Sequence, residues 1–171
     1  FRYRPEANLL VNYAFDETLS DDRRGIFANF DQALSAGGFD WIGNFRDGLE
    51  VSLGNDNEYS FFREDLESRV TASASGWLAA DPFGLSARTT GFYYLDGVPE
   101  DQDDGAAEIR GVLDDEMTGD LGLFLNTDLA LKVWTLEPLF EMQWSLFFDL
   151  AMVTNTADGF DADEDLRYGA G

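Results

Sequence analysis

Two long runs of alternating residue types constrain the fold of this chain most strongly. They are residues 122–134 (GLFLNTDLALKVW) and 141–153 (EMQWSLFFDLAMV), and the short stretch TLEP follows the first of them. Successive side chains of a strand point to opposite faces, so each run predicts a strand with one apolar and one mixed face. Both exceed the roughly five or six residues of a typical strand and reach the roughly 9–11 that cross a bilayer.

The two faces of these predicted strands differ sharply in character. The apolar faces hold Leu123, Leu125, Thr127, Leu129, Leu131 and Val133 in the first run, and Met142, Trp144, Leu146, Phe148, Leu150 and Met152 in the second. Apart from Thr127, the polar and charged residues lie on the opposite faces. Apolar-out, polar-in alternation with short turns on one side is typical of an outer-membrane barrel. Long amphipathic strands also occur in soluble barrels and large sandwiches, and that alternative stays open.

Shorter alternating segments recur along the rest of the chain. They predict strands at residues 8–15, 25–34, 39–45, 48–53, 66–79 and 85–95, and the ending RYGAG resembles the opening of another. Turn or loop residues separate them at 36–38, 54–58 and 80–84. Helical periodicity is scarce. We therefore predict an all-β, antiparallel transmembrane β-barrel, with Trp41, Trp77, Trp134 and Trp144 near strand ends as in an aromatic girdle.

The charge balance limits the partners of the chain. It has 11 basic and 34 acidic residues and a formal net charge of -23, which argues against contact with nucleic acid or anionic lipid headgroups. The 44% hydrophobic and 15% aromatic content is too high for a disordered acidic tail. These numbers predict a folded apolar body with acidic loops.

The absence of Cys and His removes several kinds of chemistry. Disulfides, thiol nucleophiles, zinc sites built on His or Cys and Ser-His-Asp triads are all excluded within this chain. We expect no enzyme and no cofactor. The opening FRYRPEANLL has no signal-peptide features and the ending opens a strand, so we expect residues 1–171 to be part of a single C-terminal barrel domain, truncated at both ends.

Asp149 lies within the apolar run Leu139–Val153 and requires a partner. A carboxylate that faced lipid or a dry core alone would cost several kcal/mol. Lys132 and Arg110 are the nearest basic candidates, and Arg110 is the more informative one. An Arg fork can hold a carboxylate with two parallel hydrogen bonds and also lie on an aromatic face. Phe147 and Asp149, two apart on one face, offer both; the plain alternative is an internal ion pair that orders a loop.

Three short motifs, in this order and spacing, carry a resemblance. They are Ile109-Arg110-Gly111, then Leu146-Phe147-Phe148-Asp149, then Leu166-Arg167-Tyr168-Gly169-Ala170-Gly171. Together they resemble the BamA-type outer-membrane assembly-factor superfamily, also called the bacterial surface antigen family. The resemblance covers roughly residues 66–171, and Val112 stands where the family usually has an aromatic residue.

The resemblance implies a 16-stranded barrel of which this chain is a fragment. It identifies residues 85–95, 122–134 and 141–153 as the eleventh, twelfth and thirteenth strands. It further implies that the loop bearing Ile109, Arg110 and Gly111 folds into the lumen, where its arginine meets Phe147 and Asp149 and anchors the loop.

The family also implies a function and a location. We expect an outer-membrane protein of a double-membraned bacterium that inserts, assembles or translocates outer-membrane proteins. Its partners would be outer-membrane lipid, unfolded outer-membrane protein substrates and accessory proteins in a larger assembly. The alternatives are a secretion translocator or a barrel anchoring a fused lipase-like domain, a diffusion channel or structural barrel, and a soluble acidic β-protein that binds a ligand or partner.

One acidic run offers a weak metal hypothesis. Asp161, Asp163 and Asp165 have the one-three-five spacing of an oxygen-ligand Ca²⁺ loop. Leu166 stands where such a loop needs Gly. The plain alternative, which we favour, is a solvated acidic loop without a metal.

Overall fold

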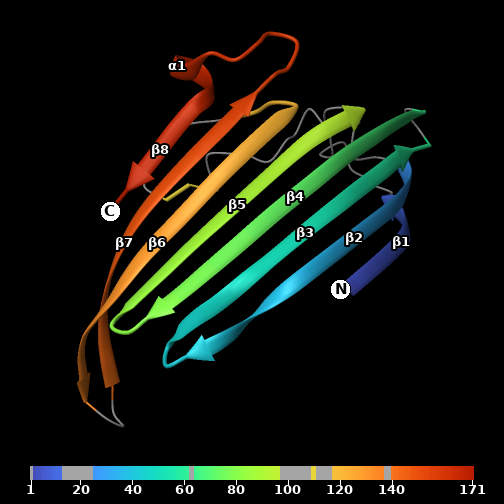
Figure 1. The fold of residues 1–171 in the computed structure, drawn as a ribbon. Coiled ribbons are helices and arrows are strands. Elements are labelled where there is room, and N and C mark those ends of the chain that lie inside the picture. Colours follow the sequence, from blue (N-terminus) through green and yellow to red (C-terminus); the bar gives the residue numbers. More distant parts are fainter. Residues whose placement is uncertain (1, 13–24, 62–63, 97–108, 111–116, 137–139) are drawn as a thin grey trace.

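The chain forms one antiparallel sheet of eight strands, in which each strand pairs with the next along the sequence (Figure 1). The computed structural model describes residues 2–12, 25–61, 64–96, 109–110, 117–136 and 140–171. The strands are β1 (Arg2–Asn12), β2 (Gly25–Ile42), β3 (Phe45–Ser60), β4 (Asp65–Ala80), β5 (Phe83–Asp96), β6 (Leu121–Leu136), β7 (Phe140–Thr154) and β8 (Leu166–Ala170). The all-β prediction is confirmed.

Helix contributes almost nothing to the described part of the chain. A single short helix, α1 (Ala162–Asp165), precedes β8. No helix among the described residues has the length and apolar character needed to cross a membrane. The architecture therefore rests on strand pairing.

The sheet is curved and open. Among the described residues, β1 pairs only with β2 and β8 only with β7. The two ends of the chain consequently lie at opposite edges of one tilted layer of strands (Figure 1). Closure into a barrel is not seen within these eight strands.

The sequence prediction was wrong about the lengths of β2 and β3. The expected turn at 36–38 lies inside β2, and the expected loop at 54–58 lies inside β3. The chain reverses instead at Gly43 and Asn44, where Gly43 has φ +61°. Gly37 is also left-handed at φ +103°, and a Cβ there would lie 2.1 Å from the Leu49 carbonyl oxygen, so this glycine permits a close backbone approach within the strand.

The polar residues of the expected loop are bonded within the sheet. The Asn57 side-chain amide donates to the Phe30 carbonyl on β2, and the Asn55 amide donates to the Arg69 carbonyl on β4. These bonds span neighbouring strands. Polar residues that are typical of a loop can therefore lie inside a long strand, because their side chains bond to the neighbouring strands.

The register of the strands defines two faces. On the first, Leu129 lies opposite Leu85 on β5 and Leu146 on β7; we call this the outward face. On the second, Asp128 lies opposite Ser86 and Phe147; we call this the inward face. The predicted separation of apolar and mixed residues along β6 and β7 is confirmed.

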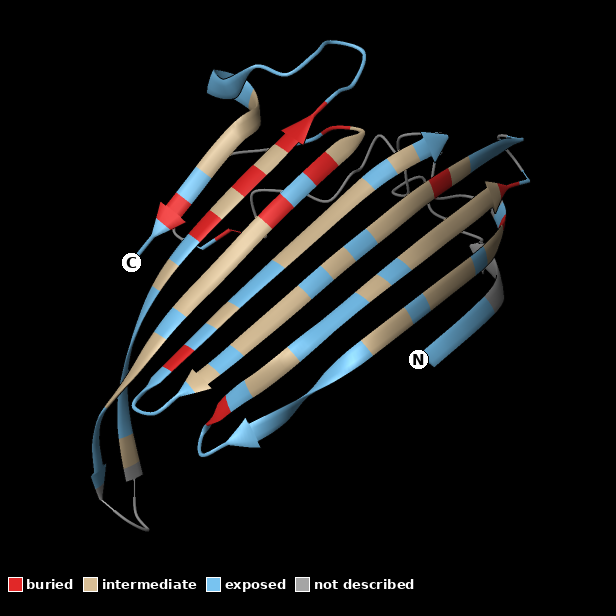
Figure 2. Cartoon of the chain, viewed as in Figure 1, coloured by how far each residue is buried: buried red, intermediate tan, exposed pale blue. Residues whose placement is uncertain are grey.

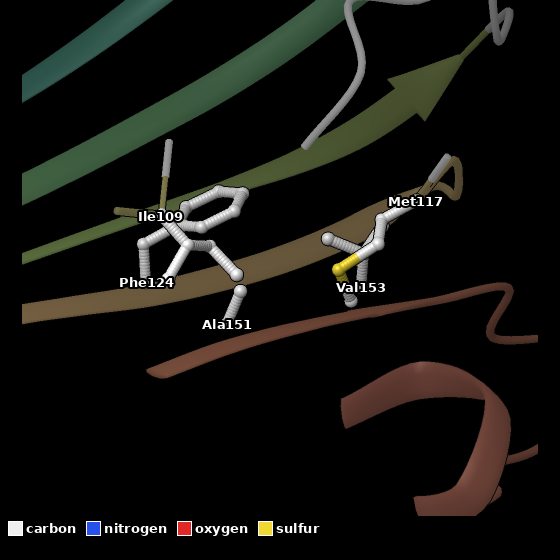
Figure 3. Packing of buried hydrophobic residues seen from close by; sticks show 5 residues of the cluster. All are labelled: Ile109, Met117, Phe124, Ala151 and Val153. Carbon is white, nitrogen blue, oxygen red and sulfur yellow. The ribbon is translucent and has the colours of Figure 1, made fainter. Parts of the chain in front are cut away.

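The densest packing lies on the inward face of β6 and β7. Figure 2 shows buried positions gathered on these two strands, whereas β2 to β5 hold mostly intermediate and exposed ones. The buried apolar cluster consists of Ile109, Met117, Phe124, Ala151 and Val153 (Figure 3). Ile109 and Met117 come from the chain between β5 and β6, and both residues lie against the sheet. That contact brings Arg110 to the middle of β7.

Candidate functional site

Asp149 lies in the middle of β7, on the inward face, and its side chain is fully buried at 0% exposure. It faces Asn126 on β6 and Gly169 on β8. Gly169, the partner of Asp149 in the register, contributes no side chain to this face. The Asn126 side chain contributes one hydrogen bond to the carboxylate.

Arg110 binds Asp149 through three nitrogens. Nε donates to Oδ2 over 2.7 Å, and Nη2 donates to Oδ1 over 2.6 Å. The backbone N–H of Arg110 also donates to Oδ2 over 3.0 Å. Two parallel charge-assisted bonds fix the guanidinium plane, and the backbone bond fixes the chain itself.

The remaining donors of Arg110 are directed at β6. Nη1 donates to Asp128 Oδ1, and Nη2 also donates to the Thr127 carbonyl over 3.1 Å. All three side-chain nitrogens are therefore engaged. We refer to the contacts of Arg110 with Asp149, Asp128 and Phe147 as the Arg110 anchor.

Phe147 supports the guanidinium from one side. The Arg110 Cζ atom lies 4.5 Å from the centre of the Phe147 ring, within cation–π range. The ring in turn lies across Gly171, where an added Cβ would be 2.6 Å from Phe147 Cε1. Phe147 and Gly171 also exchange backbone hydrogen bonds of 2.7 and 3.2 Å. Glycine at this position is what allows the ring to lie flat beside β8.

The anchor holds charge in place and offers no acid–base chemistry. The hydrogen bonds that Arg110 donates, first to Asp149 and then to Asp128, raise the pKa of its guanidinium further above the usual range, so it stays charged. Four of its five side-chain N–H groups have protein acceptors. The arrangement can fix Arg110 to the sheet, and it leaves this arginine one N–H, on Nη1, for a ligand.

The structure brings together most of the residues predicted for the site. Arg110, Phe147 and Asp149 meet as expected, and Ile109 is buried beside them; Gly111 lies outside the described residues. Lys132, the other candidate partner, binds Asp81 over 2.5 Å instead.

The weak Ca²⁺ candidates lie at the start of α1. Asp161 caps this helix by accepting from the Asp163 N–H, and Asp165 Oδ2 accepts from the Asp161 N–H. One carboxylate oxygen of Asp161 and one of Asp165 are thus engaged by backbone donors. In the described part of the chain, no group of three or more acidic side chains is arranged to hold a metal ion.

Sequence reasoning missed two features of the inward face. One is Asp128, which becomes a partner of Arg110 only once the β6–β7 register is known. The other concerns Trp41 and Trp77, which were expected in a girdle. Together with Phe39 they surround the Arg46 guanidinium, whose Cζ lies 4.5–5.7 Å from the three ring centres.

The comparisons with known proteins add no relative. No family model, curated protein or solved structure matches the chain.

Replacing Arg110 by Ala should release the segment between β5 and β6. Asp149 would keep a buried charge without its main partner, which costs about 3–5 kcal/mol for a buried pair, with the lower end expected because Arg110 is partly exposed. A cost of about 3 kcal/mol corresponds to a ~100-fold larger open population and faster cleavage between Asp96 and Leu121 in limited proteolysis.

Arg69→Ala is the matched control for this measurement. Arg69 also lies on the sheet and binds a carboxylate, but its 3.3 Å pair with Asp56 is about 40% exposed on both sides. Exposed pairs contribute about 0–1 kcal/mol. Equal cleavage rates for wild type and Arg110→Ala would show that the pair does not hold the segment.

Proposed function

We propose that this chain is part of an outer-membrane β-barrel similar to the BamA-type superfamily, with the segment after β5 fixed inside the lumen by the Arg110 anchor. The observation that carries the proposal is the contact of Arg110 with Asp149 and Phe147, because the family motif implies that these three residues meet. In this proposal the ion pair holds the segment in place and takes no part in a chemical reaction.

Strand length supports the membrane assignment. Strands β2 to β7 contain 18, 16, 16, 14, 16 and 15 residues respectively. Bilayer-spanning strands need about 9–11 residues. Each of these strands could cross a bilayer and extend beyond it.

The outward face supports the same assignment. Several large apolar side chains on this face are more than half exposed, and among them are Leu49, Leu53, Leu78, Trp144 and Leu146. Soluble monomers rarely expose contiguous apolar patches of more than a few hundred Å². Contact with lipid tails would cover this face without any further protein.

The inward face has the polarity of a lumen. One register row across the sheet runs from Glu50 through Ser75, Arg88 and Asn126 to Asp149. The proposal also requires further strands, because the free edges of β1 and β8 would otherwise present unpaired backbone groups. The 16-stranded barrel of the family would supply them.

The resemblance implies the function that we propose, in which the protein inserts, assembles or translocates outer-membrane proteins. The mechanism would be non-covalent pairing of barrel edge strands with the strands of a substrate. A segment packed on the inward face through Ile109 and Met117 favours this family over a diffusion channel, since a channel needs an open lumen.

A charge on the outward face tests the membrane assignment. Leu146→Arg should destabilise the membrane-inserted protein by about 2–4 kcal/mol, because the residue lies near the middle of β7 and would face lipid. The neighbouring Ser145→Arg is the control, because both residues are exposed but they lie on opposite faces. Unfolding in lipid vesicles should separate the two variants; equal, near-neutral effects would indicate a water-facing sheet.

Reconstitution tests the assembly function itself. Liposomes that contain the protein should fold an urea-unfolded outer-membrane barrel faster than empty liposomes, as measured by the appearance of the folded, protease-resistant form. Arg110→Ala should reduce this rate, while Arg69→Ala should leave it near the wild-type value. Folding no faster than in empty liposomes would contradict an assembly role, even with the barrel intact.

A further inference from the structure

A hollow on the inward face, beside the Arg110 anchor, has no role in the proposed function. It measures about 640 Å³. Its wall combines three arginines, several hydroxyls and aromatic rings, and its principal residues are Arg46, Arg88, Arg110, Glu50, Ser73, Ser75, Trp77 and Ser86. Thus three of the 11 basic residues of a chain with 34 acidic ones line a single hollow.

Arg88 is the unusual member of this group. The Arg110 guanidinium is already paired with the Asp149 and Asp128 carboxylates. The Arg88 side chain, by contrast, makes no ion pair or hydrogen bond within the described part of the chain, and it is exposed in the hollow. In so acidic a protein, an arginine without a carboxylate partner has five donors available.

Arg46 is held ready in a different way. Its guanidinium lies over Phe39, Trp41 and Trp77, and among the described residues it has ring contacts but no hydrogen bond or ion pair. Stacking fixes the plane of the group while leaving the N–H donors on its rim free. A pre-oriented guanidinium loses less side-chain entropy when it binds a ligand.

The hollow contains two guanidiniums without ion pairs although the whole chain is strongly negative. Arg110 carries one positive charge against two carboxylates, Asp149 and Asp128, and Arg46 and Arg88 face Glu50. The two available guanidiniums, rather than a net positive charge, therefore favour an anion here. Acidic groups elsewhere act weakly here, because the Debye length is about 8 Å at physiological ionic strength. The Ser75 hydroxyl can add a neutral hydrogen bond, whereas the Ser73 hydroxyl shares a 2.8 Å hydrogen bond with the Ser52 hydroxyl.

We propose that this hollow binds an oxyanion, a phosphate or carboxylate group, through the free guanidinium donors of Arg88 and Arg46. Guanidinium forks match the geometry of both groups and bind them with two parallel hydrogen bonds. The Ser75 hydroxyl can donate one further hydrogen bond to the anion, and Trp77 offers an apolar surface to the molecule that bears the anionic group. The site requires only the inward face of β2 to β6, so it does not depend on the assembly function.

Titration calorimetry on the whole protein, in an oxyanion-free low-salt buffer, tests this site. Inorganic phosphate and succinate are the two probes, and their relative affinities distinguish a phosphate ligand from a carboxylate ligand. Arg88→Gln should weaken binding about tenfold, which corresponds to about 1.4 kcal/mol. Its thermal unfolding should match wild type, because Arg88 has no partner to lose.

Two further variants make the test independent of any one substitution. Glu50→Gln should strengthen binding, because it removes the opposing carboxylate. Arg46→Lys should weaken binding while keeping the charge, because an ammonium lacks the planar fork. Failure of both probes to give saturable binding, or equal affinities for wild type and Arg88→Gln, would overturn the proposal.

Discussion

A fully buried carboxylate near the centre of a long strand has to be neutralised where it stands. Asp149 meets this requirement through Arg110, which reaches it from the segment between β5 and β6. Leaving that charge unpaired would cost more than most single contacts in a protein of ordinary stability. The pair therefore fixes Ile109 and Arg110, which lie between β5 and β6, against the sheet.

The surroundings of this pair are shaped by small residues. Gly169 lies opposite Asp149 in the register, and at Gly171 an added Cβ would lie 2.6 Å from the Phe147 ring. On β6, Gly122 leaves room for the Phe92 ring, since an added Cβ would be 2.2 Å from it. Aromatic rings that lie over strand glycines cover backbone that would otherwise be bare. The positions of Gly122 and Gly171 thus determine where aromatic rings can lie on the inward face.

The sequence was sufficient for the strands whose alternation is regular. In β4, β6 and β7 the apolar period alone located the elements, and the isolated Asp149 indicated an arginine partner. It was insufficient where one residue type has two structural uses. Gly37 and Gly43 look alike in sequence, yet the first lies within β2 and only the second is in a turn, a difference that strand register determines.

The same limit applies to charged partners. Nothing near Asp128 in sequence shows that it meets Arg110, because the contact depends on the alignment of β6 with β7. The unpaired state of Arg88 is equally invisible in sequence, because it depends on distances across neighbouring strands.

A double-mutant cycle on Arg110 and Asp149 tests the central claim most directly. The free energy of unfolding would be measured for Arg110→Ala, Asp149→Ala and the double variant. If the pair anchors the segment, the double variant should lose about 2 kcal/mol less than the sum of the two single losses, within the range of coupled contacts. Simple additivity of the two losses would contradict the account.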